Sequence, residues 1–494
     1  MRREFLVLAA VRCVKLTLNV VTLVLYGRLF GVGPEMDAWI LASSIVAAAG
    51  MAIWGAVNET VRSRYVHEKE DRGETEANKT AVSLIVFTTG ISVLLCLVLY
   101  FCTPAVIRYF SSDNELAPTA EVTHILVLLL PSLVLVQLLN LVVSYMNCYG
   151  VVYLPEFTGI AGALLNILCT ILLATELGVH AIVWGYYAGL LVSTVVILNF
   201  LIAKGFFGSF VWSAKIIQSG FSAVAFALPL FLAYLIGQAN VLYEKYLAGL
   251  MGVGVISSVN YASQIRFTLQ AVLSSVLFSV VVPRLTLVAT QRSGEFKKIL
   301  MNSQLATFIF ILAVVPFVYG ASDGLAAVIL GSKSEGADAV DVVARLIRLY
   351  SLALLPICLY SLYAGALLSQ QKGKVYGFLG AFAQLCSMGI CAFMYKKLGA
   401  EVFPVALFFS HLFVSVLMLC KIDVEGRFLI ARNAFAVSTL TVLVAFFCLW
   451  LFVYFARAFE SSITAVGAVG VGYVLCLAVT GCVFLVWRKK SAVA

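Results

Sequence analysis

Residues 29–45 read Leu-Phe-Gly-Val-Gly-Pro-Glu-Met-Asp-Ala-Trp-Ile-Leu-Ala-Ser-Ser-Ile, and residues 250–265 read Leu-Met-Gly-Val-Gly-Val-Ile-Ser-Ser-Val-Asn-Tyr-Ala-Ser-Gln-Ile. Each carries Leu-x-Gly-Val-Gly and, eight or nine residues later, Ala-Ser-x-Ile, so the two stretches align at an offset of about 221 residues. Chance similarity between glycine-rich turns is the alternative, but the second match at nearly the same distance favours duplication. Such a repeat predicts two similar helical bundles, which in membrane transporters enclose a substrate site at their interface.

The composition is that of a membrane protein. The chain is 62% hydrophobic and 12% charged, which is about half the charged fraction of a soluble domain. Apolar runs of about 20 residues recur along its length, and each can cross a hydrocarbon core ~30 Å thick. The first run follows Met-Arg-Arg-Glu and extends past residue 25, which is too long for a cleaved signal peptide. The sequence therefore predicts an all-α polytopic membrane protein.

The apolar runs predict about fourteen transmembrane helices, at residues 5–30, 38–57, 81–103, 122–146, 158–176, 180–203, 219–245, 256–282, 300–321, 346–369, 375–395, 401–420, 431–455 and 464–487. Two parallel six-helix repeats then form an N-lobe (1–217) and a C-lobe (218–425), while residues 426–494 add two helices and a cytoplasmic tail. The polar segment 58–80 is predicted to be a solvated cytoplasmic loop. With a cytoplasmic N-terminus, 21 of the 33 Lys and Arg fall in inner segments or at their edges, whereas six fall in outer segments. The positive-inside rule therefore favours cytoplasmic N- and C-termini.

Several classes of function find no support in the sequence. The twelve cysteines form no Cys-x-x-Cys pattern and the four histidines are scattered singly, so we predict neither a disulfide framework nor a metal site. The net charge of +9 reports membrane orientation rather than nucleic-acid binding. No P-loop, kinase or hydrolase motif is present, and no outer loop is long enough for a catalytic domain. We therefore expect a secondary transporter without a cofactor, not an enzyme.

Polar residues inside the spans concentrate on the opening hairpin of each repeat. Exposure of such residues to lipid is costly, and they usually face the interior of a helix bundle or a water-filled cavity. Arg12, Lys15 and Asn19 share one helix face by their i, i+3, i+7 spacing. We assign to the substrate cavity Arg12, Lys15, Asn19, Arg28, Asp37, Gln238, Gln264 and Arg266. We assign to ion coupling or gating Asn58, Glu59, Glu244 and Lys245. Snorkelling is the alternative for Arg12 and Lys15, and interfacial exposure is the alternative for Glu244 and Lys245.

A cavity lined by Arg and Lys suits an anionic ligand, and the forked donors of Arg suit phosphate in particular. This chemistry leaves a secondary transporter for an anionic or amphiphilic substrate as the interpretation drawn from the residues themselves.

The residues around the first turn, Gly27-Arg28-Leu29-Phe30-Gly31-Val32-Gly33 followed by Asp37-Ala38, resemble a motif of the MurJ/MviN lipid II flippases. These belong to the MOP (multidrug/oligosaccharidyl-lipid/polysaccharide) exporter superfamily. Further similarity lies at Asn147, Pro155, Phe157, Asn166, Ile167, Gln238, Ala248, Gly254, Ser257, Tyr261-Ala262 and Pro283-x-Leu285. The resemblance covers at least the first ten predicted helices and agrees with fourteen spans.

The chain also departs from the family pattern. Leu16 and Thr22 stand where the family's first helix has arginines, for which Arg12 and Lys15 are candidate substitutes from neighbouring positions. Ser263-Gln264 replaces the common Asp-Arg, with Arg266 two residues further on. Because charged cavity positions recognise the ligand, these departures leave open which lipid-linked saccharide is carried.

The resemblance implies an inner-membrane flippase for lipid II or a related polyprenyl-diphosphate glycan, working by alternating access in peptidoglycan or envelope polysaccharide synthesis. Arg12, Lys15 and Arg266 would hold the diphosphate, and Asn19, Gln238 and Gln264 would meet sugar or peptide. The expected partners are this lipid and the membrane, with contacts to glycan-synthesis enzymes left open. Membrane potential or a Na⁺ or H⁺ gradient would drive transport. The alternatives are a cation-coupled exporter of the MATE type, a membrane-embedded glycan enzyme and a non-transporting scaffold.

Overall fold

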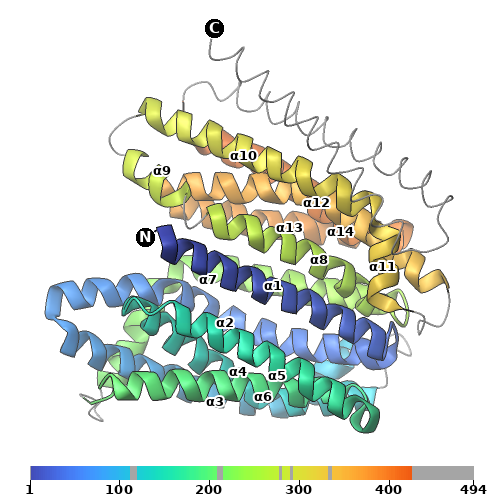
Figure 1. The fold of residues 1–494 in the computed structure, drawn as a ribbon, viewed down its shortest axis with the longest axis horizontal. Coiled ribbons are helices and arrows are strands. Elements are labelled where there is room, and N and C mark those ends of the chain that lie inside the picture. The colour runs from blue at the N-terminus through green and yellow to red at the C-terminus, as the bar shows by residue number, and fades with distance from the viewer. Residues whose placement is uncertain are drawn as a thin grey trace. The chain divides into compact units, whose positions relative to one another are not determined.

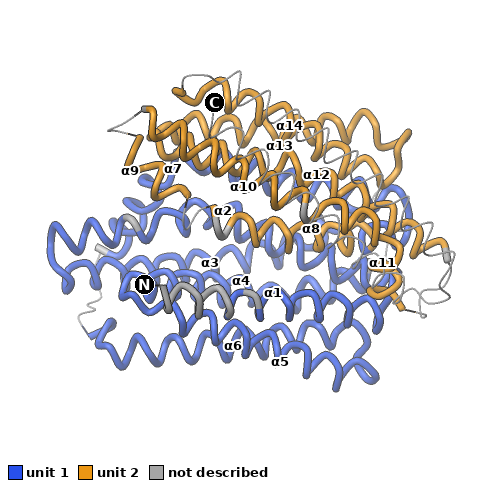
Figure 2. The backbone as a smooth tube through the Cα atoms, turned by 45° about the horizontal axis from the view of Figure 1, so that its top comes forward, with its two compact units in different colours: residues 1–257 blue, residues 258–494 orange. Residues whose placement is uncertain are grey.

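A computed structural model describes residues 2–111, 119–208, 215–277, 281–289, 293–331 and 337–424. Every regular element in these ranges is a helix (Figure 1). The elements are α1 (Arg2–Phe30), α2 (Pro34–Arg72), α3 (Glu74–Ser111), α4 (Thr119–Cys148), α5 (Tyr153–Leu177), α6 (His180–Ala203), α7 (Lys215–Leu250), α8 (Val255–Val276), α9 (Val282–Ala289), α10 (Ser293–Gly320), α11 (Ser322–Leu330), α12 (Ala337–Ser369), α13 (Gly373–Leu398), η2 (Gly399–Glu401) and α14 (Val402–Lys421). The chain divides into two compact units, residues 1–257 and 258–494 (Figure 2).

The described helices confirm an all-helical, multi-pass membrane protein. Eight helical segments within the described ranges are long and apolar enough to cross a membrane. A ninth candidate combines Ile216–Leu228 with Leu230–Leu250, which meet at an angle of 76° where Pro229 removes a backbone donor. The predicted spans 431–455 and 464–487 lie outside the described residues, so the count of fourteen spans stays a prediction.

One local prediction was wrong, and a short helix was missed. The segment 58–80 is not a loop, because α2 continues to Arg72 and α3 begins at Glu74, with only Gly73 between them. Across this turn Lys69 Nζ lies 2.8 Å from a Glu74 carboxylate oxygen, and this hydrogen bond raises the pKa of Lys69. The short helix α11 was not predicted at all, because nine residues are too few to register as a span.

Unit 1 is held together by the packing of α5 on α6, of α2 on α3 and α4, and of α7 on α2 and α3. Its core contains Trp54, Leu141, Tyr145 and Ile197, and the indole of Trp54 donates to Ser92 Oγ at 2.9 Å. The buried indole N–H therefore has a partner, as buried tryptophans usually require. Helix α1 packs on α5.

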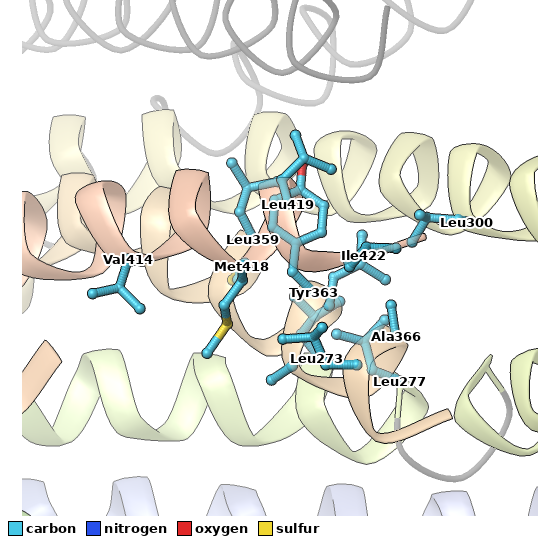
Figure 3. Packing of buried hydrophobic residues seen from close by; sticks show 14 of the residues in the cluster. Leu273, Leu277, Leu300, Leu359, Tyr363, Ala366, Val414, Met418, Leu419 and Ile422 are labelled. Atoms are coloured by element: carbon cyan, nitrogen blue, oxygen red, sulfur yellow. The ribbon is translucent and has the colours of Figure 1, made fainter. Parts of the chain in front are cut away.

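Unit 2 is built in its described part around α12, which packs against α9, α10, α11, α13 and α14. Its core gathers side chains from several helices, as Figure 3 shows for Leu273, Leu300, Tyr363, Val414 and Met418. Its pairings of α13 with α14, α12 with α14 and α10 with α12 parallel those of α5 with α6, α4 with α6 and α3 with α4 in unit 1.

Candidate functional site

A cavity of about 690 Å³ lies within unit 1, among α1, α2, α4, α5 and α6. Apolar side chains such as Leu139, Val143 and Ile197 form part of its wall. Its polar and charged lining consists of Arg12, Lys15, Arg62, Asn140, Asn147, Glu156, Thr158 and Ser193. Three cations and one carboxylate face this space, so the cavity carries a net positive charge.

The parallel packing of α1 on α5 brings two predicted site residues together. Arg12 Nε lies 3.1 Å from Glu156 Oε1, and Lys15 Nζ lies 3.5 Å from Glu156 Oε2. Lys15 follows Arg12 by three positions, which places both on the helix face turned toward α5. Further along the same helix pair, the Tyr26 hydroxyl donates to Asn166 Oδ1 at 2.9 Å. Both cations therefore pair with Glu156 across the contact between α1 and α5.

The two cations remain accessible to a ligand although both are paired. The side chains of Arg12 and Lys15 are 39% and 43% exposed, whereas that of Glu156 is 16% exposed. A guanidinium has five donors and an ammonium has three, so one shared carboxylate leaves donors on both groups available. Additional anionic oxygens entering the cavity would find hydrogen-bond donors in place.

Asp37 joins the two glycine-rich turns that are repeated in the sequence. Its carboxylate is buried and accepts backbone hydrogen bonds from Gly254 at 2.5 Å and from Ser257 at 2.7 Å. These donors lie at the N-terminus of α8, where unpaired N–H groups favour a negative charge. A Cβ built on Gly254 would lie 2.7 Å from Val32 Cγ1, so the turns approach too closely for a larger residue. Gly254 also has a φ of +83°, which glycine adopts most readily.

The other predicted cavity residues are dispersed. Asn19 and Arg28 are exposed on α1, and neither lines the cavity. Gln238 is half-buried on α7, and Gln264 is exposed on α8. Arg266 lies in unit 2 and is only 7% exposed. Its guanidinium stacks 3.8 Å above the Phe267 ring and donates to Gln270 Oε1 at 2.8 Å.

The residues predicted for ion coupling or gating make local contacts in unit 1. Asn58 exchanges two amide hydrogen bonds of 3.1 Å with Gln137. Glu59 is exposed and accepts a 2.8 Å hydrogen bond from the Tyr234 hydroxyl. Glu244 accepts from Asn240 Nδ2 at 3.3 Å, and Lys245 is buried on the same helix. Asn58, Glu59 and Glu244 thus each have a hydrogen-bond partner outside this group of four.

Sequence reasoning missed the remaining parts of this cavity. Arg62 lies in the segment 58–80 that the sequence predicts to be a loop, and Glu156 precedes the predicted fifth span, so the pattern of charges inside spans includes neither residue. The signal for Glu156 was present, since a carboxylate preceded by proline is typical of a first helical turn.

Outside this cavity, two histidines that are far apart in the sequence form a pair: His124 Nδ1 lies 2.8 Å from His180 Nε2.

Known proteins show similarity over nearly the whole chain. The family model described as Lipid II flippase MurJ matches residues 27–470. A solved structure of "Lipid II flippase MurJ, inward closed conformation" is similar with a TM-score of 0.79 at 16% identity, over 97% of this chain and 100% of that one. An inward-facing multidrug resistance MATE family transporter of the MOP superfamily gives a TM-score of 0.68 at 15% identity, over 86% and 95% of the two chains.

A MOP superfamily transporter from Pyrococcus furiosus gives a TM-score of 0.57 at 17% identity, over 83% of this chain and 93% of that one. No curated protein matches the sequence significantly. The structural similarities establish the fold, and the family model, which covers most of the chain, establishes the relationship. The chain belongs to the Lipid II flippase MurJ family.

Proposed function

We propose that this protein is a flippase that translocates a polyprenyl-diphosphate-linked saccharide, lipid II or a related glycan precursor, across the bacterial inner membrane. The protein acts as a transporter rather than an enzyme. Membership of the lipid II flippase family supports this class of substrate. The polyprenyl tail stays in lipid while the charged headgroup passes through the protein.

The observation that carries the ligand class is the positive cavity in unit 1. Arg12, Lys15 and Arg62 all line it, and Arg donors match the paired oxygens of a diphosphate. Asn140, Asn147, Thr158 and Ser193 supply amides and hydroxyls for the saccharide. In this proposal Arg12 and Lys15 hold the diphosphate. Arg266 has two candidate roles: binding the ligand, or packing inside unit 2.

Transport proceeds by alternating access of the N-lobe, residues 1–217, and the C-lobe, residues 218–425. The parallel helix pairings in units 1 and 2 support a duplication of this kind. Asp37 closes the outer turns by holding the N-terminus of α8, and release of this contact accompanies outward opening. Both chain termini lie in the cytoplasm, and residues 426–494 are an addition to the repeats.

A cation-coupled exporter of the MATE type is the second candidate, because the fold is shared with such transporters. The pairing of Glu156 with two cations argues against it, since a cationic drug would be repelled by Arg12 and Lys15. The two functions differ in the sign of the charge that the cavity accepts.

The test is transport of a fluorescent polyprenyl-diphosphate disaccharide in liposomes containing the purified protein. We expect the wild type to move this lipid between leaflets, and the Arg12→Gln/Lys15→Gln double variant to lose at least about tenfold in rate, because two charge-assisted contacts are removed. The matched control is Lys79→Gln, a charge removed from an exposed ion pair in α3. Absence of movement by the wild type, or uptake of a cationic dye by it, would reject the flippase assignment. Arg266→Ala separates the two roles of Arg266: lost transport at normal thermal stability indicates ligand binding.

A further inference from the structure

Glu156 is the residue of the cavity that opposes an anionic ligand. Its two carboxylate oxygens lie 3.1 Å and 3.5 Å from the cationic groups of Arg12 and Lys15, respectively. These are the positions that two phosphate oxygens would take. Glu156 therefore occupies the site that we assign to the diphosphate.

Once a ligand displaces Glu156 from Arg12 and Lys15, the carboxylate needs new hydrogen-bond donors. When a diphosphate takes Arg12 and Lys15, the freed carboxylate is still largely enclosed, because its side chain is only 16% exposed. A charged group held away from water without hydrogen bonds is strongly disfavoured. Something in the occupied cavity must then donate to Glu156.

A saccharide attached to the diphosphate provides those donors. Sugar hydroxyls and N-acetyl amide N–H groups donate to a carboxylate, whereas a bare diphosphate has only acceptors when ionised. Thr158 and Ser193 also line the cavity. The Ser193 hydroxyl donates to the Thr158 carbonyl at 3.1 Å, so its oxygen is left to accept from a sugar hydroxyl. Gly159 leaves room for Lys15, because a Cβ there would lie 3.1 Å from its Nζ.

We propose that Glu156 selects glycan-bearing polyprenyl diphosphates over bare ones, by accepting hydrogen bonds from the saccharide after the diphosphate has displaced it from Arg12 and Lys15. This inference rests on the proposed function and names a specificity residue within its site. This selectivity favours transport in one direction. A reaction that removes the glycan outside the membrane leaves a bare polyprenyl diphosphate, and the site does not bind this product for return transport.

The experiment measures binding of two probes to the full-length protein in lipid nanodiscs: undecaprenyl diphosphate, and undecaprenyl diphosphate carrying a disaccharide. We expect the wild type to prefer the disaccharide lipid. Glu156→Gln keeps the shape of the side chain but removes its charge, so affinity for bare undecaprenyl diphosphate should rise by roughly three- to tenfold, as expected for loss of a partly exposed competing ion pair. Affinity for the disaccharide lipid should rise less, so the ratio of the two affinities falls toward one. Glu156→Ser is a second neutral variant, in which this ratio should fall as well.

The matched control is Glu176→Gln, an exposed carboxylate near the other end of α5, which should leave both affinities unchanged. Equal changes in both affinities, or no change, in the two Glu156 variants would overturn the role of Glu156 while leaving the flippase assignment intact. Failure of the wild type to bind either lipid would instead reject the proposed function.

Discussion

Asp37 and Glu156 are two carboxylates that the fold uses in different ways. Asp37 is buried and satisfied by backbone donors at the N-terminus of α8, so its contact fixes one turn against another. Glu156 instead pairs with two partly exposed side chains that line a cavity, so a ligand can reach both partners of this contact. The first arrangement suits closure of a path, and the second suits exchange for a ligand.

At Asp37 we expect Asp37→Asn to destabilise the protein by about 1–2 kcal/mol, because an amide offers one acceptor oxygen to two backbone donors and carries no charge for the helix N-terminus. Thermal unfolding in detergent measures the loss. Glu35→Gln is the control, since Glu35 is exposed in the same first turn of α2. Equal unfolding temperatures for Asp37→Asn and wild type would contradict the capping role.

The reciprocal amides of Asn58 and Gln137 allow a sharper residue-level test. Asn58→Leu leaves the amide of buried Gln137 without its partner, which should cost about 1–3 kcal/mol. Asn58→Leu combined with Gln137→Leu removes both polar groups and should recover much of that loss. Thermal unfolding of the single and double variants gives the interaction free energy between Asn58 and Gln137. A double variant that is no more stable than Asn58→Leu would contradict this account of the amide pair.

At the scale of elements, the contact between α5 and α6 depends on glycines that bring the two backbones together. A Cβ on Gly189 would lie 2.5 Å from the carbonyl oxygen of Gly162, and backbone cannot move aside as a flexible side chain can. We expect Gly189→Ala to destabilise unit 1 by about 1–3 kcal/mol through overpacking. Gly90→Ala in α3 is the control, because a Cβ there meets nothing within 4 Å. Unchanged thermal stability in Gly189→Ala would show that the helices can separate at little cost.

The elements also show what could be predicted from the sequence. Each of the first twelve apolar runs falls on a helix. The spacing of Arg12 and Lys15 agrees with their shared contact with Glu156, whereas Asn19, predicted for the same face, does not line the cavity. Their partner Glu156 could not be predicted from α1 alone, because the pairing depends on which helix packs beside it. Arg62 was missed for a related reason: the charges after residue 58 resembled a loop, but α2 extends beyond its apolar part. Hydropathy detects the membrane-crossing length, whereas cavities arise from helix contacts.

At the scale of the whole molecule, the distribution of Lys and Arg predicts which ends of the helices face the cytoplasm. We expect a cysteine at Thr75→Cys to be shielded from a membrane-impermeant maleimide in intact cells, and one at Glu176→Cys to react. Both positions are exposed: Thr75 lies in the first turn of α3 and Glu176 in the last turn of α5. The predicted topology places these two helix ends on opposite sides of the membrane. The background is a chain with its twelve native cysteines replaced. Labelling of Thr75→Cys alone would invert the topology.

The same positive charge predicts how transport is driven. One elementary charge crossing 100 mV is worth ~2.3 kcal/mol, so a diphosphate with about two negative charges gains ~4–5 kcal/mol at most when moving outward through an inside-negative membrane. The empty cationic cavity is drawn back toward the cytoplasmic side by the same field. A K⁺ diffusion potential set with valinomycin, in liposomes whose protein orientation is measured by labelling Thr75→Cys, should therefore accelerate outward movement. Its collapse should slow that movement. Rates independent of the potential, together with acceleration by an imposed Na⁺ or H⁺ gradient, would assign the driving force to an ion instead.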